Sequence, residues 1–277
     1  MKSTVLISLV SMGGIGAVFG IVLAIASKKF AVEIDPRIEK INEVLPGANC
    51  GACGQAGCFN VAEAIAAGEL PVDFCPVGGE EAALKIAEIM GVETEPTKEK
   101  KVARVFCRGG NKEAKKIAEY RGVMDCRAAN AVSGGPKGCR YGCLGFGNCA
   151  AVCPFGGIYI NENGLPVINE DICKGCGRCA EACPRGLIKL IDKSKEIHVG
   201  CNSQDKGKDV RQVCSIGCIG CKACERACKF DAVKVENNVA KIDYDKCTNC
   251  GKCAEACPTK TIQSIHASEE ELCSVRS

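Results

Sequence analysis

Tryptophan is absent from this 277-residue sequence, and aromatic residues make up only 4% of it. Large aromatic side chains therefore cannot dominate its cores in the usual way. The sequence has only two histidines, His198 and His266, and neither lies at a spacing typical of a zinc finger or a catalytic triad. It has no flavin motif, and Gly109-Gly110 does not form a phosphate-binding loop. Basic blocks and stacking aromatics are missing too, which argues against a nucleic-acid partner. A self-contained dehydrogenase is therefore not supported.

Cysteine, in contrast, is abundant, with 25 residues. Such a density fits a secreted disulfide framework, zinc modules or iron–sulfur sites. The spacing favours the last of these, because the runs Cys218–Cys228 and Cys247–Cys257 both read C-x₂-C-x₂-C-x₃-C. This is the run of bacterial ferredoxins, in which the fourth cysteine ligates the cluster of the other run. Zinc modules prefer cysteine pairs with longer spacers, often with histidine. We therefore expect [4Fe–4S] clusters and electron transfer.

A second ferredoxin-like pair precedes this one. Its later run, Cys173–Cys183, has the standard spacing, whereas its earlier run, Cys139–Cys153, is stretched to C-x₃-C-x₅-C-x₃-C. A similar hairpin-like segment precedes each later run, which indicates an internal duplication. Crossed ligation then predicts four clusters. The predicted ligand sets are Cys139, Cys143, Cys149 and Cys183; Cys153, Cys173, Cys176 and Cys179; Cys218, Cys221, Cys224 and Cys257; and Cys228, Cys247, Cys250 and Cys253.

A fifth cluster is predicted near the N-terminus, where the spacing C-x₂-C-x₄-C-x₁₆-C supplies its own fourth ligand. Its cysteines are Cys50, Cys53, Cys58 and Cys75. A zinc ion bound by four cysteines is the alternative. Asp35-Pro36 is expected to open a helix before this motif, and further helices are expected at 61–67 and 80–90.

Five cysteines remain: Cys107, Cys126, Cys201, Cys214 and Cys273. Cys107 and Cys201 each follow a strand-like segment, 102–106 or 196–199, and each is expected to precede a helix, 112–120 or 205–213. If these two βα-like units pack side by side, the first four sulfurs could hold a sixth cluster. The alternatives are buried thiols that act as small hydrophobic residues, and a disulfide, which a reducing compartment disfavours.

The segment Ser3–Ser27 contains no charged residue. As a helix it would cross roughly 30 Å of hydrocarbon. A cleaved signal peptide is the alternative, since Ala24-Ile25-Ala26 resembles a cleavage site. Its apolar core would be unusually long, however, and exported thiols would meet an oxidising compartment. We expect one uncleaved anchor in the cell inner or plasma membrane, with the cluster domains on the cytoplasmic side. The lysines on either side of the segment give little information about the orientation, so the need of the clusters for a reducing compartment decides it.

Charge is unevenly spread along the chain. Residues 29–95 hold 4 basic and 12 acidic side chains, whereas residues 96–277 hold 30 basic and 21 acidic ones. This split fits either a mixed solvated surface or an acidic redox partner steered to the later domains. The lysines are scattered along the chain rather than clustered in blocks, which favours a mixed solvated surface.

The expected fold class is α+β: an N-terminal transmembrane helix, a small helical [4Fe–4S] domain and two bacterial-ferredoxin-like double-cluster modules. The expected divisions are an anchor at 1–28, a single-cluster domain at 29–92, a linker with a βα unit at 93–135, a first module at 136–192, a connector at 193–213, a second module at 214–265 and a tail at 266–277.

This order of parts resembles the B subunit family of the Rnf complex, the ion-translocating ferredoxin:NAD⁺ oxidoreductase. The best local marks are the segments 49–58 and 136–139 and the stretched loop of 138–153. The resemblance covers essentially the whole chain. It implies a subunit that takes electrons from reduced ferredoxin and passes them to the membrane and flavin-bearing subunits of a translocase. It also implies that NAD and ion sites lie on other subunits.

The sequence departs from the ferredoxin pattern at Lys229, which follows Cys228 where proline is usual. Two other functions stay open: a cluster-bearing subunit of a membrane hydrogenase or formate dehydrogenase, and a membrane-tethered redox sensor. A sensor needs only one labile cluster, so five predicted clusters favour a relay.

Overall fold

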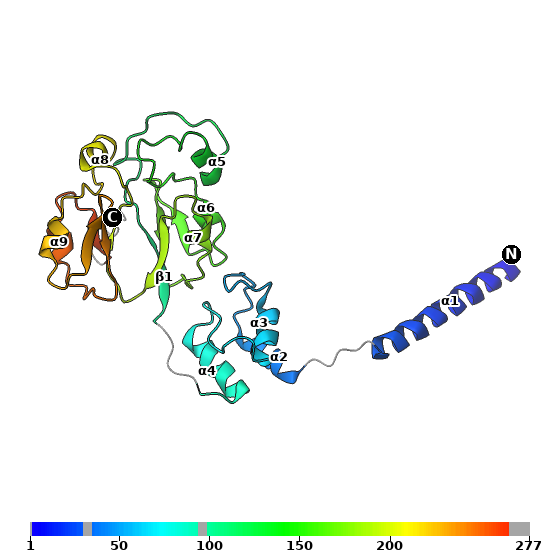
Figure 1. Ribbon diagram of the computed structural model, residues 1–277. Coiled ribbons are helices and arrows are strands. Elements are labelled where there is room, and N and C mark those ends of the chain that lie inside the picture. The colour runs from blue at the N-terminus through cyan, green and yellow to red at the C-terminus, as the bar shows by residue number, and fades with distance from the viewer. Residues whose placement is uncertain (1, 30–34, 94–98, 266–277) are drawn as a thin grey trace, which may run out of the picture.

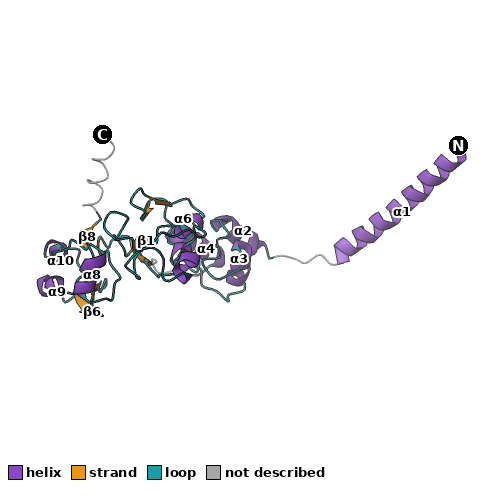
Figure 2. Cartoon of the chain, turned by 90° about the horizontal axis from the view of Figure 1, so that it is seen from above, coloured by secondary structure: helices purple, strands orange, loops and turns teal. Residues whose placement is uncertain are grey.

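The computed structural model describes residues 2–29, 35–93 and 99–265. One long helix, a small helical domain and two β-containing modules follow one another along the chain (Figure 1). Figure 2, seen from above, shows the same succession. Cys273 and His266 lie outside the described residues, as does the predicted tail.

The first helix, α1 (Lys2–Lys29), is long and apolar enough to cross a membrane. Its window Met12–Lys29 has a mean hydropathy of 1.4, and none of that window is buried. Phe19, Ile21 and Leu23 are each more than half exposed. Because 28 helical residues span about 42 Å, α1 exceeds the roughly 30 Å of a bilayer core.

The small domain consists of α2 (Pro36–Val44), α3 (Cys58–Ala66) and α4 (Gly79–Met90). Asp35 caps α2 by accepting a hydrogen bond from the Arg37 backbone N–H, as expected for an Asp-Pro start. Helix α3 begins three residues before the predicted start, because the Asn49 side chain accepts the Cys58 N–H at 2.8 Å. The core consists of aliphatic side chains from all three helices, including Ile41, Val61, Ile65 and Ile86.

Four two-stranded antiparallel sheets and six short helices form the two modules. The sheets pair β1 (Lys101–Val105) with β4 (Ile188–Asp192), β2 (Ile158–Ile160) with β3 (Pro166–Ile168), β5 (Ile197–Val199) with β8 (Ile262–Ser264), and β6 (Val233–Glu236) with β7 (Val239–Ile242). The helices are α5 (Cys126–Ala131), α6 (Asn148–Ala151), α7 (Arg178–Ala182), α8 (Gly207–Val213), α9 (Ala223–Ala227) and α10 (Lys252–Glu255).

The internal duplication extends further than the cysteine runs suggested. Strands β1 and β5, which fall in the predicted linker and connector, each pair with the last strand of the module that follows them. Phe106 N–H donates to the Leu187 carbonyl at 2.7 Å, and Gly200 N–H donates to the Thr261 carbonyl at 2.8 Å in the same place. Cys107 and Cys201 therefore occupy equivalent positions, directly after the first strand of each module.

The predicted helix at 112–120 does not form, although its composition is helical. Its backbone bonds to other segments instead: Lys115 N–H donates to the Val213 carbonyl, and Gly138 N–H donates to the Lys115 carbonyl, both at 2.9 Å. The Glu113 carboxylate accepts from Gly110 N–H and from the Asn163 side chain. These long-range bonds outweigh local helix propensity, which is a weak preference. The second unit does contain its helix, α8.

Candidate metal centres

The structure gathers 24 cysteines into six groups of four, which we number by their spatial succession. Site 1 is Cys50, Cys53, Cys58 and Cys75; site 2 is Cys153, Cys173, Cys176 and Cys179; site 3 is Cys126, Cys143, Cys149 and Cys183; site 4 is Cys107, Cys139, Cys201 and Cys214; site 5 is Cys218, Cys221, Cys224 and Cys257. Site 6 is Cys228, Cys247, Cys250 and Cys253, whose Cys253 thiol faces the other three. The first five line cavities.

Sites 1, 2, 5 and 6 bring together the cysteines that spacing predicted. In sites 2 and 6 one cysteine comes from the earlier run and three from the later run of a module. Site 5 shows the reverse arrangement. These groupings have the geometry of crossed ligation, in which each ferredoxin run completes its partner's cluster.

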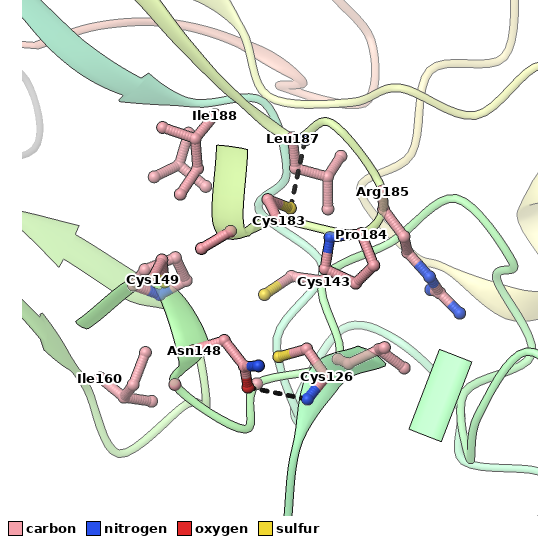
Figure 3. Close-up of a pocket in the computed structure, with 16 residues that line it drawn as sticks. Cys126, Cys143, Asn148, Cys149, Ile160, Cys183, Pro184, Arg185, Leu187 and Ile188 are labelled. Carbon is pink, nitrogen blue, oxygen red and sulfur yellow. Dashed lines mark hydrogen bonds between the residues drawn. The ribbon is translucent and has the colours of Figure 1, made fainter. Parts of the chain in front are cut away.

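Site 3 differs from the predicted set, because Cys126 takes the place of Cys139. Figure 3 shows Cys126, Cys143, Cys149 and Cys183 around one cavity. Cys126 is the first residue of α5, and its N–H donates to Asn148 Oδ1 at 2.8 Å. Because Asn148 also begins α6 beside Cys149, one side chain fixes two of the four cysteines.

Site 4 was left open by the sequence. Cys107 and Cys201 come from the equivalent ends of β1 and β5, Cys214 follows α8, and Cys139 comes from the stretched loop. Glycine permits the close approach: a Cβ on Gly109 would lie 3.3 Å from the Cys214 sulfur and 3.8 Å from that of Cys107. Three of the four leftover thiols thus converge, as the sixth-cluster alternative required, but Cys126 does not join them.

Linear spacing could not reveal this exchange. Cys139 is only four residues from Cys143, and the two nevertheless face different cavities. The available signal was numerical: of the 25 cysteines, 24 make six sets of four. The repeated strand–cysteine pattern was a second signal.

Backbone N–H groups point at several sulfurs. Leu187 N–H lies 3.4 Å from the Cys183 sulfur, Ala232 N–H lies 3.4 Å from that of Cys228, and Thr261 N–H lies 3.3 Å from that of Cys257. The donor is in each case four residues after the cysteine. Hydrogen bonds to the sulfurs are one way in which proteins set cluster potentials.

Burial and crowding keep many of these thiols protonated in the metal-free chain. Burial, together with the neighbouring Cys107 sulfur, raises the pKa of Cys143 to about 12. Burial likewise raises the pKa of Cys149 to about 11, with Cys126 adding to the effect. Burial also raises the pKa of Cys201 to about 12. Since metal ligation needs thiolates, filling these sites must release protons.

The cavities fit a polynuclear cluster better than single zinc ions. Zinc needs four sulfurs about 2.3 Å from one point. Among the described residues, no three His, Cys, Asp or Glu side chains converge closely enough to hold one metal ion. The sulfurs instead line the walls of cavities whose other lining is mostly glycine and aliphatic side chains. All-cysteine ligation around such a space is typical of iron–sulfur clusters.

Neighbouring sites contact one another in succession. Cys179 of site 2 faces Cys149 of site 3. Cys143 N–H of site 3 donates to the Cys107 sulfur of site 4 at 3.2 Å. Cys218 N–H of site 5 bonds to Cys201 of site 4. Site 4 therefore lies between the two modules.

The same succession continues at both ends. Cys228 of site 6 donates its N–H to the carbonyl of Cys224 in site 5 at 3.1 Å. At the other end, the Arg178 side chain in site 2 donates to the Cys50 carbonyl of site 1 at 3.1 Å.

Comparisons with known proteins agree with this chemistry. Family models match residues 45–77 as a putative Fe-S cluster domain, 166–189 as a 4Fe-4S binding domain and 217–261 as a 4Fe-4S dicluster domain. The chain is 50% identical to the B subunit of the Na⁺-translocating ferredoxin:NAD⁺ oxidoreductase complex of Acetobacterium woodii, over 95% of this chain and 78% of the relative. The chain belongs to the B subunit family of ion-translocating oxidoreductase (Rnf) complexes.

Two further relatives match this chain over nearly their whole lengths. The B subunit of the ion-translocating oxidoreductase complex of Methanosarcina acetivorans is 45% identical over 95% of this chain and 99% of its own. The B subunit of the proton-translocating ferredoxin:NAD⁺ oxidoreductase complex of Clostridium ljungdahlii is 45% identical over 95% and 93%. This Rnf family member is thus a membrane-associated electron-transfer subunit of a multi-subunit oxidoreductase, with iron–sulfur clusters as its cofactors.

Proposed function

We propose that the chain carries electrons from reduced ferredoxin to the membrane and flavin-bearing subunits of an ion-translocating ferredoxin:NAD⁺ oxidoreductase, through six [4Fe–4S] clusters. The relatives' names supply the partner and the reaction class. NAD and the transported ion are handled by other subunits, because no nucleotide fingerprint occurs in this sequence. Its role is that of a translocase subunit that does not act on NAD alone.

The observation that carries this proposal is the unbroken succession from site 6 to site 1. Without site 4, the two ferredoxin-like modules would be separate double-cluster units. With site 4 present, hydrogen bonds join the loops or sulfurs of neighbouring sites along the succession. This arrangement fits a relay, in which intermediate centres shorten each electron step.

The two ends of the succession differ in exposure. Among the described cysteines only Cys221 and Cys250 are exposed, and they belong to sites 5 and 6. Site 1 lies in the domain that follows α1, at the other end (Figure 1). We therefore place electron entry from ferredoxin at sites 5 and 6 and electron exit at site 1, on the cytoplasmic side of the membrane.

Iron content tests the cluster count. The loaded full-length chain should hold about 24 iron atoms, from four per cube. Cys107→Ala and Cys126→Ala should each remove about four, from sites 4 and 3 respectively. Cys273→Ala, which changes a cysteine that is not among the 24 assigned to the six sites, is the matched control. A parent with about 20 iron atoms, unaffected by Cys107→Ala, would limit the relay to five clusters.

A kinetic test addresses the partner. Reduced ferredoxin should bleach the clusters of the full-length chain in a stopped-flow mixing experiment. Adding NAD⁺ to the reduced chain alone should produce no NADH. NADH formation by the isolated chain would contradict the relay assignment.

A further inference from the structure

Arg185 lies directly beside site 3, two residues after its ligand-position cysteine Cys183. It is half-buried, and Figure 3 shows its guanidinium pointing away from the four sulfurs of site 3. The side chain therefore does not line the cavity as a ligand. Its hydrogen bonds show where the guanidinium reaches instead.

Four acceptors surround the guanidinium, three of them backbone carbonyls. Nε donates to Asn130 Oδ1 at 3.0 Å. Nη1 donates to the carbonyls of Cys139, at 3.1 Å, and of Gly142, and Nη2 donates to the carbonyl of Gly134. Arginine presents five N–H groups in a rigid planar fork, whereas lysine offers a single nitrogen. Only arginine can hold all four acceptors at once.

The loop held in this way is the one that separates sites 3 and 4. Gly142 N–H donates to the Cys139 carbonyl at 3.3 Å and closes a tight turn. Cys139 before the turn lines site 4, and Cys143 after it lines site 3. Arg185 binds the carbonyls of both Cys139 and Gly142, so it fixes the turn that directs the two cysteines apart.

The charge of Arg185 faces the same two sites. The groups that interact electrostatically with it are the sulfurs of Cys139, Cys143, Cys107 and Cys183, two from each site. Within the described residues, no carboxylate forms an ion pair with it. A half-buried positive charge without a carboxylate partner is screened less than a surface charge. A cluster that accepts an electron becomes more negative, so this charge stabilises its reduced form.

The second module has no cation at this position. The residue corresponding to Arg185 there is Thr259, which also stands two residues after a cysteine, Cys257. The Thr259 hydroxyl contacts the Cys257 sulfur at 3.7 Å and bonds to Thr261 at 2.7 Å. The arginine is thus specific to the module whose loop is shared between two sites.

We propose that Arg185 is a positioning residue that divides the Cys139–Cys143 loop between two [4Fe–4S] sites and raises the reduction potentials of both. The inference rests on the proposed filling of sites 3 and 4. One residue would then raise the potentials of the two central clusters of the relay together, so that both stay reducible while the difference between them changes little.

The test is a potentiometric titration of the loaded full-length chain in detergent, followed by electron paramagnetic resonance. In Arg185→Met, two one-electron steps should move to lower potential, each by about tenfold in the ratio of reduced to oxidised cluster, which is about 59 mV. The other steps should keep their potentials. When Arg185→Met is added to a Cys201→Ala variant, which lacks only the site 4 cluster, a single step, that of site 3, should move to lower potential.

Two further variants separate charge from geometry. Arg185→Lys keeps the charge but not the fork, so its potentials should stay near the parent's while a chelator removes iron faster. Arg127→Met removes an exposed charge beside Cys126 and should leave every step in place. Parent potentials and parent chelation rates in both Arg185 variants would overturn the inference. A parent with about 20 iron atoms would instead point to failure of the six-cluster proposal.

Discussion

Lys229 replaces the usual proline after Cys228 without changing the local backbone. Cys228 has φ −81° and ψ 113°, and Cys183, which precedes Pro184, has φ −82° and ψ 110°. Proline forces the preceding residue into this extended region, and Cys228 adopts it unaided. The bond from the N–H four residues later is also kept in both places. The departure from the ferredoxin pattern therefore leaves the sulfur where a ligand is needed.

Also at the residue scale, His198 should make stability depend on pH. Burial, together with the nearby charge of Arg104, lowers its pKa to about 4, so the folded state favours the neutral ring. Arg108 and Glu170 are the other charged groups that face it. Since the unfolded pKa is about 6.5, this contribution is present above that pH and is lost as the pH falls towards about 4.

His198→Gln should therefore flatten the loss of thermal stability between about pH 7 and about pH 4.5, measured by circular dichroism on the loaded chain. The chain's second histidine provides the control, His266→Gln, which should follow the parent. An identical pH profile for His198→Gln would show that the ring is protonated without cost.

At the scale of elements, the side chains of Asp125 and Asn148 join α5 to α6. Asp125 caps α5 by accepting the N–H groups of Arg127 and Ala128, each at 2.8 Å. Asn148 donates to the Asp125 carboxylate and accepts from Cys126 N–H. Helix α5 has only six residues, so it depends on these bonds for its position.

Asn148→Ala should loosen site 3 selectively. It removes two partly buried hydrogen bonds, each worth about 0.5–1.5 kcal/mol, and frees Cys126 from its place beside Cys149. We expect faster release of about four iron atoms to a chelator, with the other clusters retained. Asn161→Ala removes a comparable bond to Leu165 N–H within the β2–β3 turn and should release iron at the parent's rate. Equal rates in the two variants would contradict this role.

At the scale of the whole molecule, the acidic part of the chain contacts its basic part. Residues 29–95 carry a net charge of −8 (4 basic, 12 acidic), and residues 96–277 carry +9 (30 basic, 21 acidic). The two parts meet where Arg178 donates to the Cys50 carbonyl. A Cβ on Gly51 would also lie 3.7 Å from the same arginine nitrogen. Electrostatic complementarity thus favours contact between the single-cluster domain and the first module.

Arg178→Met should slow the electron step between sites 2 and 1 without removing iron. Freeze-quench resonance after mixing with reduced ferredoxin should show site 1 filling later than in the parent, and more so at high ionic strength. Lys174→Met, an exposed cation in the same cysteine loop, is the matched control. If site 1 fills at the parent's rate in Arg178→Met, this contact does not control the step.

Short-range spacing was enough to predict much of the molecule. The parts predicted in this way are the apolar helix α1, the helices around site 1, and the cysteine sets of sites 1, 2, 5 and 6. A ferredoxin run wraps three corners of a cube locally, and duplication supplies the fourth from a run of the same kind. Such patterns can be read without coordinates.

Sites 3 and 4, in contrast, depend on contacts between distant parts of the chain. Site 4 collects cysteines separated by up to 107 positions in the sequence, from Cys107 to Cys214. The exchange of Cys126 for Cys139 depends on a turn held by Arg185 and on the bond from Cys126 to Asn148. The segment 112–120 forms no helix for the same reason, because bonds to distant residues fix its backbone. Long-range contacts of this kind leave no periodicity or spacing in the sequence, so folding in three dimensions was needed to assign these two sites.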